Sequence, residues 1–162
     1  MRNLFAAAFI AAVALPVRAE EKGDLAPNMT EAKVPLERGI AAGKSAGTPI
    51  SAKYEVEDGK LQLSVYTAKG DSFSEVVVDH KTGKVAKSDP ITKGDDLTAA
   101  KSQKEAIGKA KTSLEAAVTK AVKANKGYRA VSAMPSLKDG RPVAEITLMK
   151  GAQSKTVSQP LD

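Results

Sequence analysis

The chain offers few side chains that could perform acid–base, nucleophilic or metal chemistry. Its 162 residues include one His and no Cys or Trp, which excludes thiolate catalysis, disulfides and cysteine-based zinc sites. His80 lies beside Asp79 in a predicted turn, where a solvated loop histidine is the simpler interpretation. A Ser–His–Asp arrangement would also need a positioned nucleophile and a pocket that excludes water. We therefore expect no catalytic residue and no enzymatic activity.

The acidic residues form no pattern typical of glycosidase or metal chemistry. Asp95 or Asp96 can cap a helix, and most other Asp residues fall in predicted turns, where Asp bonds its own backbone. The sequence contains no calcium-binding loop, Gly-rich phosphate loop or His–Glu metal motif, so we expect no cofactor and no metal ion. A weak calcium site built from turn carboxylates is an open alternative, because oxygen ligands alone suffice for calcium.

Lysines form the one charged surface that the sequence predicts. Helical spacing over residues 97–126 places apolar side chains on one side and lysines on the other. The candidate electrostatic contact face consists of Lys101, Lys109, Lys120, Lys123 and Lys126. Such a face is most simply solvated, and the alternative is a weak contact with anionic lipid or another polyanion. Arg, which recognises nucleic acids best, supplies five of the 25 basic residues, so we expect no nucleic-acid partner.

The first 19 residues have the features of a secretory signal peptide. A basic start at Arg2 precedes twelve uncharged apolar residues, 4–15, and Val17 and Ala19 place small side chains before a cleavage site. Twelve residues are too few to cross a bilayer, which needs about 20. We therefore expect cleavage after Ala19 and a periplasmic or secreted protein with no transmembrane segment in its mature chain.

The remaining sequence contains two stretches in which a helix precedes alternating strands. Residues 20–30 are polar and are interpreted as a flexible leader. In the first stretch, 31–87, a helix begins near Pro35 and strands follow at 51–57, 61–67 and 73–79. A breaker-rich segment, 88–96, is interpreted as a linker.

The second stretch, 97–162, repeats this order. Residues 97–126 form either one helix or two helices joined by a bend near Gly108, and strands are predicted at 128–134, 143–149 and 155–158. Together the two stretches predict an α+β fold of two small units, each a helix packed on an antiparallel three-stranded meander.

Parts of both stretches resemble a known family. The segment SLEAAVTKAVKANKG, a strand, the tetrapeptide DGRP and a further strand, within 113–149, resemble a PepSY domain. This family is the small helix-plus-meander module of some protease propeptides and exported bacterial proteins. The run VVVDHKTGKV, 76–85, is similar to its terminal strand and Asp-x-x-Thr-Gly turn, whereas the second stretch ends without that turn. The resemblance implies two diverged PepSY-like units in tandem, 31–87 and 97–162.

Without reactive side chains, the chain can act through main-chain edges or through its lysines. An open sheet edge can accept an extended peptide as an additional strand. Combined with the resemblance to protease propeptides, this predicts a non-enzymatic exported protein that binds and modulates another envelope or secreted protein, such as a peptidase. The alternative is a surface-associated protein that binds anionic lipid, a polyanion or a metal ion through the lysine face or turn carboxylates.

Overall fold

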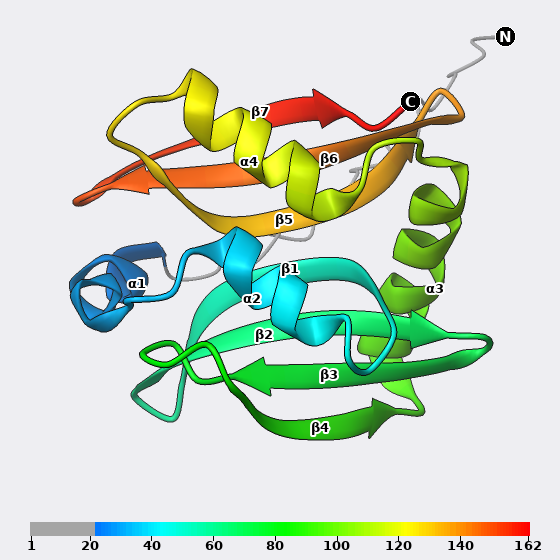
Figure 1. The fold of residues 1–162 in the computed structure, drawn as a ribbon, viewed down its shortest axis with the longest axis horizontal. Coiled ribbons are helices and arrows are strands. Elements are labelled where there is room, and N and C mark those ends of the chain that lie inside the picture. The colour runs from blue at the N-terminus through cyan, green and yellow to red at the C-terminus, as the bar shows by residue number, and fades with distance from the viewer. Residues whose placement is uncertain (1–21) are drawn as a thin grey trace, which may run out of the picture.

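One antiparallel sheet of seven strands organises residues 22–162, the part of the chain that the computed structural model describes (Figure 1). The strands are β1 (Thr48–Glu57), β2 (Lys60–Lys69), β3 (Ser72–Val78), β4 (Val85–Ile91), β5 (Arg129–Lys138), β6 (Arg141–Lys150) and β7 (Gln153–Pro160). The helices are α1 (Lys22–Asn28), the 3-10 helix η1 (Met29–Glu31), α2 (Leu36–Gly43), α3 (Gly94–Lys109) and α4 (Leu114–Ala124). The predicted signal peptide, 1–19, lies outside the described residues.

The predicted fold class, two small units each with its own three-stranded meander, is wrong. The strand order β4-β3-β2-β1-β5-β6-β7 joins both halves of the chain into one sheet through pairing of β1 with β5. The two halves also share a core, because buried residues of β1–β3 and of β5–β6 belong to one cluster. Alternating patterns report which residues of a strand are buried, but they carry no information about which distant strands pair.

Strand β4 lies across the predicted boundary between the first unit and the linker. Its sequence VAKSDPI contains Pro90 and shows no apolar alternation, because every position except Ile91 is exposed. A proline is tolerated here because β4 is an edge strand, whose outer N–H groups have no partner in the sheet.

The helical segments also differ from the sequence interpretation. Residues 22–31, assigned mainly to a flexible leader, form α1 and η1, and Met29 is buried in the main core. Between 97 and 126 the chain forms two helices, α3 and α4, so of the two alternatives the bent one is correct. Ser113 caps α4 by accepting a hydrogen bond from the amide of Ala116 at 3.2 Å.

The hairpins β1–β2 and β5–β6 have the same geometry at a constant offset of 81 residues. Each closes on an Asp-Gly pair with both residues at positive φ, Asp58-Gly59 in the first and Asp139-Gly140 in the second, as a type I′ turn requires. Each has a register shift at the same place, Pro49/Ser51 in β1 and Ala130/Ser132 in β5.

The same offset relates the next strand of each half. Ser72 of β3 pairs with Lys69, and Gln153 of β7 pairs with Lys150. Beyond these strands, the carbonyl of His80 accepts two consecutive amides that precede α2, and the carbonyl of Leu161 accepts two that precede α4. Strands β3 and β7 therefore occupy equivalent positions in the two halves.

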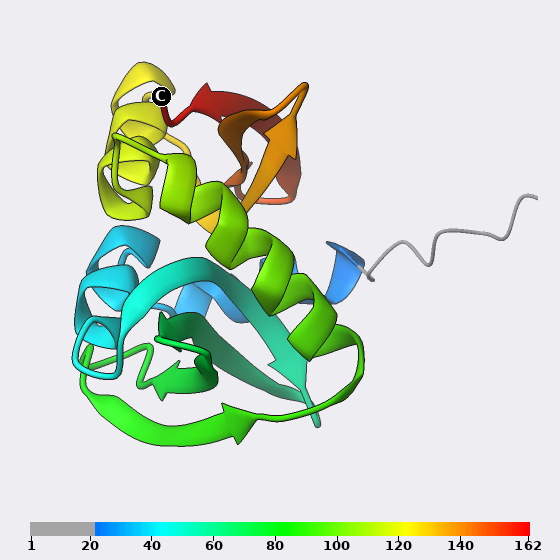
Figure 2. The ribbon, with the colours of Figure 1, turned by 90° about the vertical axis from the view of Figure 1, so that its right-hand side faces the viewer.

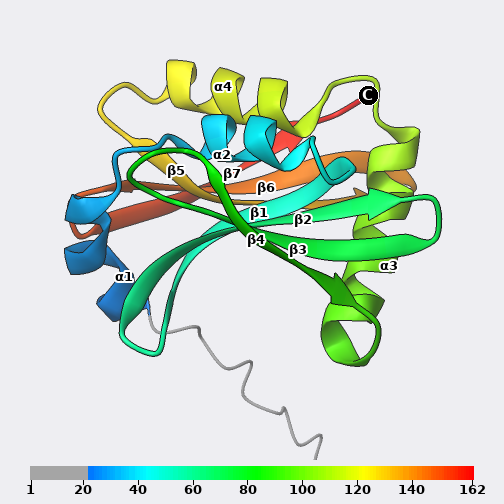
Figure 3. The ribbon, with the colours of Figure 1, turned by 60° about the horizontal axis from the view of Figure 1, so that its bottom comes forward.

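Helices α2 and α4 lie side by side over one face of the sheet (Figures 2 and 3). Two glycines in α2 allow this helix to approach β2 closely. A Cβ atom added at Gly39 would lie 2.6 Å from Leu63 Cδ2, and one added at Gly43 would lie 2.5 Å from Val65 Cγ1. The glycines that weaken the helical pattern in the sequence are therefore packing residues.

Helix α3 packs on the opposite face of the sheet. Its buried Ala100 joins a smaller cluster with Ile50, Ala68 and Phe73. Side chains alternate between faces along a strand, and Ala68 differs in parity from Leu63 and Val65, which pack in the main core. In Figure 2, α3 runs diagonally across the view, whereas α2 and α4 stand one above the other.

Arg129 of β5 connects the second half of the chain to the segment that precedes α2. Its guanidinium donates to the carbonyl oxygens of Ala32 at 3.0 Å, Met29 at 3.3 Å and Val34 at 3.4 Å. The guanidinium carbon lies 5.9 Å from the ring centre of Tyr54, whose hydroxyl also donates to the Val34 carbonyl. One side chain thus donates to three carbonyls; those of Met29 and Val34 also accept from the Ala32 amide and the Tyr54 hydroxyl, whereas no other donor to the Ala32 carbonyl is found among the described residues.

We expect Gly39→Ala to destabilise the protein by about 1–2 kcal/mol, because overpacking against Leu63 outweighs the helix propensity of Ala. Gly108→Ala in α3 is the matched control, since a Cβ there would meet nothing within 4 Å. It should be neutral or stabilising by up to about 1 kcal/mol. Urea denaturation measures both variants, and equal effects would contradict the close approach of α2.

We also expect Arg129→Lys to cost about 1–3 kcal/mol, because an ammonium cannot reproduce the planar fork that reaches three carbonyls, and the substitution removes the donor to the Ala32 carbonyl. The exposed Arg141 provides the control: Arg141→Lys should change the free energy of unfolding by less than about 0.5 kcal/mol. Thermal and urea unfolding compare the two substitutions. If both variants unfold like the wild type, Arg129 does not join the two halves.

Candidate functional site

The predicted lysine face does not form a single surface. Lys101 and Lys109 lie on α3, whereas Lys120 and Lys123 lie on α4 and Lys126 follows it, and the two helices run at a steep angle to one another (Figure 3). All five side chains are exposed, and Lys109 is paired with Glu105 at 3.3 Å. Four of the five residues are therefore divided between two helices that pack on opposite faces of the sheet.

His80 has a structural environment. Its carbonyl accepts the amides of Lys33 and Val34 at 2.9 and 3.0 Å, and its Nδ1 atom is buried without a hydrogen-bond partner in the structure. The carboxylate of Asp79 likewise accepts the backbone amides of Lys81 and Thr82, both at 2.8 Å. These backbone hydrogen bonds lower the pKa of Asp79. Asp79 and His80 thus belong to the turn that follows β3.

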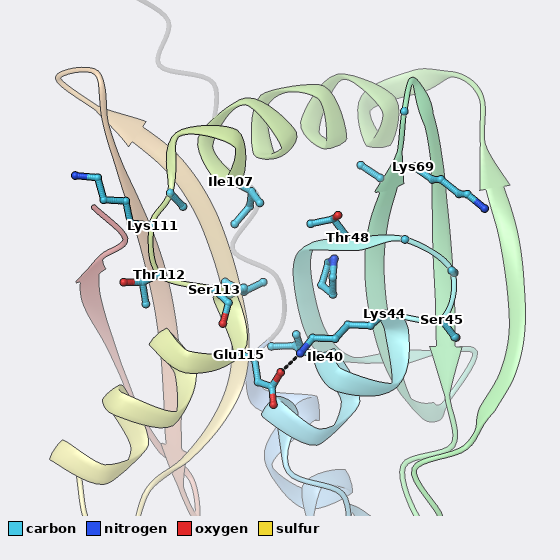
Figure 4. A pocket seen from close by; sticks show the side chains of 17 residues that line it. Ile40, Lys44, Ser45, Thr48, Lys69, Ile107, Lys111, Thr112, Ser113 and Glu115 are labelled. Atoms are coloured by element: carbon cyan, nitrogen blue, oxygen red, sulfur yellow. Dashed lines mark hydrogen bonds and ion pairs between the residues drawn. The ribbon is translucent and has the colours of Figure 1, made fainter.

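A cleft of about 810 Å³ lies where α2, the β2–β3 turn, and the end of α3 with the start of α4 meet (Figure 4). Ile40, Ile107 and Leu114 contribute apolar side chains to it, and Thr48 and Ser113 contribute hydroxyls. Ile40 and Leu114 are almost fully buried, at 1% and 3% exposure, so the floor offers little apolar surface to a ligand.

Charged groups at this cleft do not converge on a common point. Lys44 at the end of α2 pairs with Glu115 of α4 across the opening, whereas Lys69 and Lys111 extend away from it (Figure 4). Both partners of the ion pair are partly exposed, and such pairs contribute at most about 1 kcal/mol. The cleft has no arrangement of cations that would select an anionic ligand.

A polar cluster occupies the face of the sheet opposite α2. The buried Ser64 hydroxyl lies 2.7 Å from Glu75 Oε1 and 3.0 Å from Glu55 Oε1, and Gln62 donates to Ser64 at 2.9 Å. Burial raises the pKa of the nearby Tyr66, and the negative charge of Glu55 and Glu75 adds to this effect. These groups satisfy one another across β1, β2 and β3. Among residues 22–162 no group of three or more His, Asp or Glu residues could hold a metal ion.

The two outer strands of the sheet differ in how they are protected. In β4, Pro90 has no N–H to donate, Lys87 and Asp89 form an ion pair at 3.0 Å, and the register with β3 shifts at Val77/Val78. Proline, charged side chains and irregular pairing are devices that block an edge against further strands. The outer edge of β4 is therefore a protected one.

Strand β7 has fewer of these devices, since its one proline, Pro160, is its last residue. It pairs with β6 at eight consecutive positions without a register shift, and Lys155 is its one ionisable residue. Just beyond the strand, the amide of Leu161 donates to the Pro142 carbonyl of β6 at 2.9 Å. Because alternate residues of an antiparallel strand bond to opposite sides, Ser154, Thr156 and Ser158 direct their N–H and C=O groups outward. Three successive outward positions thus present a donor and an acceptor each.

The side chains of β7 present different chemistry on the two faces of the sheet. Val157 packs against the main core on the side of α4. The hydroxyls of Thr156 and Thr147 lie 3.3 Å apart on the opposite face. Lys155 shares the face of Val157, and its Nζ atom lies 4.3 Å from the ring centre of Tyr128. The outward edge of β7, with Ser154, Thr156 and Ser158, is the candidate functional site and is called the β7 edge below.

Sequence reasoning predicted an open sheet edge as a class of site but not the β7 edge itself. The segment 155–158 was predicted as a short strand, and its apolar Val157 between polar residues is the signal for it. Which strand is outermost depends on pairing between distant segments, and no pattern in the sequence reports this.

Comparisons with known proteins give no family. No family model matches the chain, and no curated protein matches it. Among solved structures, a candidate lipoprotein from Clostridium difficile 630 is similar with a TM-score of 0.46 and 14% identity, covering 80% of this chain and 88% of that chain. A similarity at this level supports no argument about function. No helix among residues 22–162 has the length and apolar character needed to span a bilayer.

Proposed function

We propose that this is an exported protein without enzymatic activity that binds an extended segment of another envelope or secreted protein at the β7 edge, and so modulates that protein. The resemblance to PepSY modules of protease propeptides makes a peptidase the partner class to test first. Main-chain pairing of this kind needs no reactive side chain, in keeping with the absence of Cys and the structural environment of His80.

The observation that carries this proposal is a difference between the outer sides of two equivalent strands, β3 and β7. Strand β3 has β4 paired along its outer side, whereas among residues 22–162 no strand pairs with the outer side of β7. A partner segment on the β7 edge would occupy the position that β4 fills in the first half of the chain. The fold itself therefore contains an example of the pairing that we propose.

The alternative function, attachment to an anionic surface through the predicted lysine face, receives less support. Attraction to anionic lipid adds up only for lysines that reach one surface together and falls off within a Debye length. Lys101 and Lys109 lie on a different helix and a different face from Lys120 and Lys123. The five residues cannot act as one contact face.

Export leads to a direct prediction. The protein recovered from the periplasm or culture medium should begin at Glu20, because the residues before it have the signal-peptide pattern. Intact-mass analysis together with N-terminal sequencing identifies the first residue. Recovery of the protein from the cytoplasm with residues 1–19 attached would contradict export.

Binding at the β7 edge is tested by removing one outward donor. Thr156→Pro deletes an N–H that makes no bond to β6, and an edge strand tolerates proline at such a position. Thr156→Ala is the matched control, because it loses the same side-chain contact with Thr147 and keeps the N–H. A photo-crosslinking residue at Ser158 in the exported protein reports the partner in the producing organism.

We expect one crosslinked partner with the wild type and with Thr156→Ala, and a loss of about tenfold or more with Thr156→Pro. Peptidase activity of the exported fraction, measured with and without the protein, should change together with crosslinking. Thermal unfolding checks that the variants fold, and Ser154→Pro serves as a second variant if Thr156→Pro does not. Equal crosslinking by all variants, or the same adduct from a probe at Asp89 in β4, would overturn the proposal.

A further inference from the structure

The charge of the protein is distributed unevenly between its two halves. Residues 20–96 contain 11 basic and 14 acidic side chains, a net charge of −3, whereas residues 97–162 contain 12 basic and 5 acidic ones, a net charge of +7. The β7 edge belongs to the basic half. The two outer strands of the sheet thus lie in surroundings of opposite net charge.

Two of the four acidic side chains near the β7 edge are already paired. From α4 to the last residue the acidic side chains are Glu115, Asp139, Glu145 and Asp162. Glu115 pairs with Lys44, and Glu145 pairs with Lys138 at 2.5 Å. A hydrogen bond from Lys138 also lowers the pKa of Glu145, which keeps that carboxylate charged. Asp139 lies in the turn between β5 and β6.

Several cations in this region have no carboxylate partner among the described residues. They are Lys120, Lys123, Lys126, Arg141, Lys150 and Lys155. Lys155 belongs to β7 and shares a sheet face with α4, where Lys120 and Lys123 are exposed. A strand added at the β7 edge would place every second side chain on this face.

We infer that the segment bound at the β7 edge is acidic, with Asp or Glu at alternate positions that meet Lys155 and the cations of α4. The inference rests on the proposed function. Opposite charges on neighbouring strands stabilise pairing, and like charges destabilise it. The basic surroundings therefore attract an acidic strand and exclude a basic one, so they provide a selectivity that main-chain hydrogen bonds alone do not have.

The test uses two blocked, fluorescently labelled eight-residue peptides and the purified protein. One peptide alternates threonine with glutamate, and the other alternates threonine with lysine. Fluorescence anisotropy measures binding, and amide chemical shifts of ¹⁵N-labelled protein locate it. We expect the glutamate peptide to bind at least about tenfold more tightly and to shift the amides of Ser154, Thr156 and Ser158.

Two variants assign the charge effect to the basic half. Lys155→Gln should weaken binding of the glutamate peptide by about threefold and leave the weak binding of the lysine peptide unchanged or stronger. Lys60→Gln is the control, because Lys60 is an exposed lysine at the start of β2 in the acidic half. It should leave both peptides unaffected.

The outcomes separate this inference from the function on which it rests. Equal affinity for both peptides, with shifts at Ser154, Thr156 and Ser158, overturns the acidic preference and retains strand pairing. Binding of the glutamate peptide that shifts only amides of α4 overturns pairing at the edge and shows a lysine contact instead. Failure of both peptides to bind overturns both proposals.

Discussion

The whole structure depends on the pairing of β1 with β5, which makes one sheet from two hairpins that are far apart in the sequence. The pairing spans two positions, Ala52 with Ala133 and Lys53 with Ser132. Continuing this register would place Ile50 opposite Pro135, which has no N–H to donate. So short a backbone contact needs support from side chains, and Arg129 and the packing of α2 beside α4 supply it. Without this junction the two hairpins would not share a core, and β7 would not be the outer strand of a seven-stranded sheet.

The local parts of the fold could be predicted from the sequence because their causes are local. Alternating apolar residues and the Asp-Gly turns at 58–59 and 139–140 predict both hairpins, and the structure forms them. The joining of the hairpins, the edge strand β4 and the placement of α3 on the opposite face could not be predicted. Each depends on a contact between distant residues, such as Ala100 against Phe73, that leaves no periodic pattern.

An open sheet edge could be proposed from the sequence as a type of site, but its location at β7 could not. The lack of Cys and the turn position of His80 lead to the prediction that the chain acts through main-chain edges or through charge. A single helical axis over 97–126 would place all five lysines on one side. The chain turns between Lys109 and Leu114, so two helices with different axes form this segment. The glycines at 39 and 43 weaken the helical pattern of their own segment in the sequence. In the structure they allow α2 to pack closely on β2.

Strands β3 and β7 occupy equivalent positions in the two halves, but their outer sides differ. After β3 the chain turns at Asp79 and returns as β4, which pairs with the outer side of β3. The edge of β4 itself carries Pro90 and an ion pair. After β7 the carbonyl of Leu161 accepts the amides that precede α4, just as the carbonyl of His80 after β3 accepts those that precede α2. Equivalent backbone contacts thus follow both strands, and the difference between the halves is β4, which pairs with the outer side of β3, whereas among residues 22–162 no strand pairs with the outer side of β7. The outward donors and acceptors of Ser154, Thr156 and Ser158 are main-chain groups, so the chemistry of the β7 edge is that of the backbone itself.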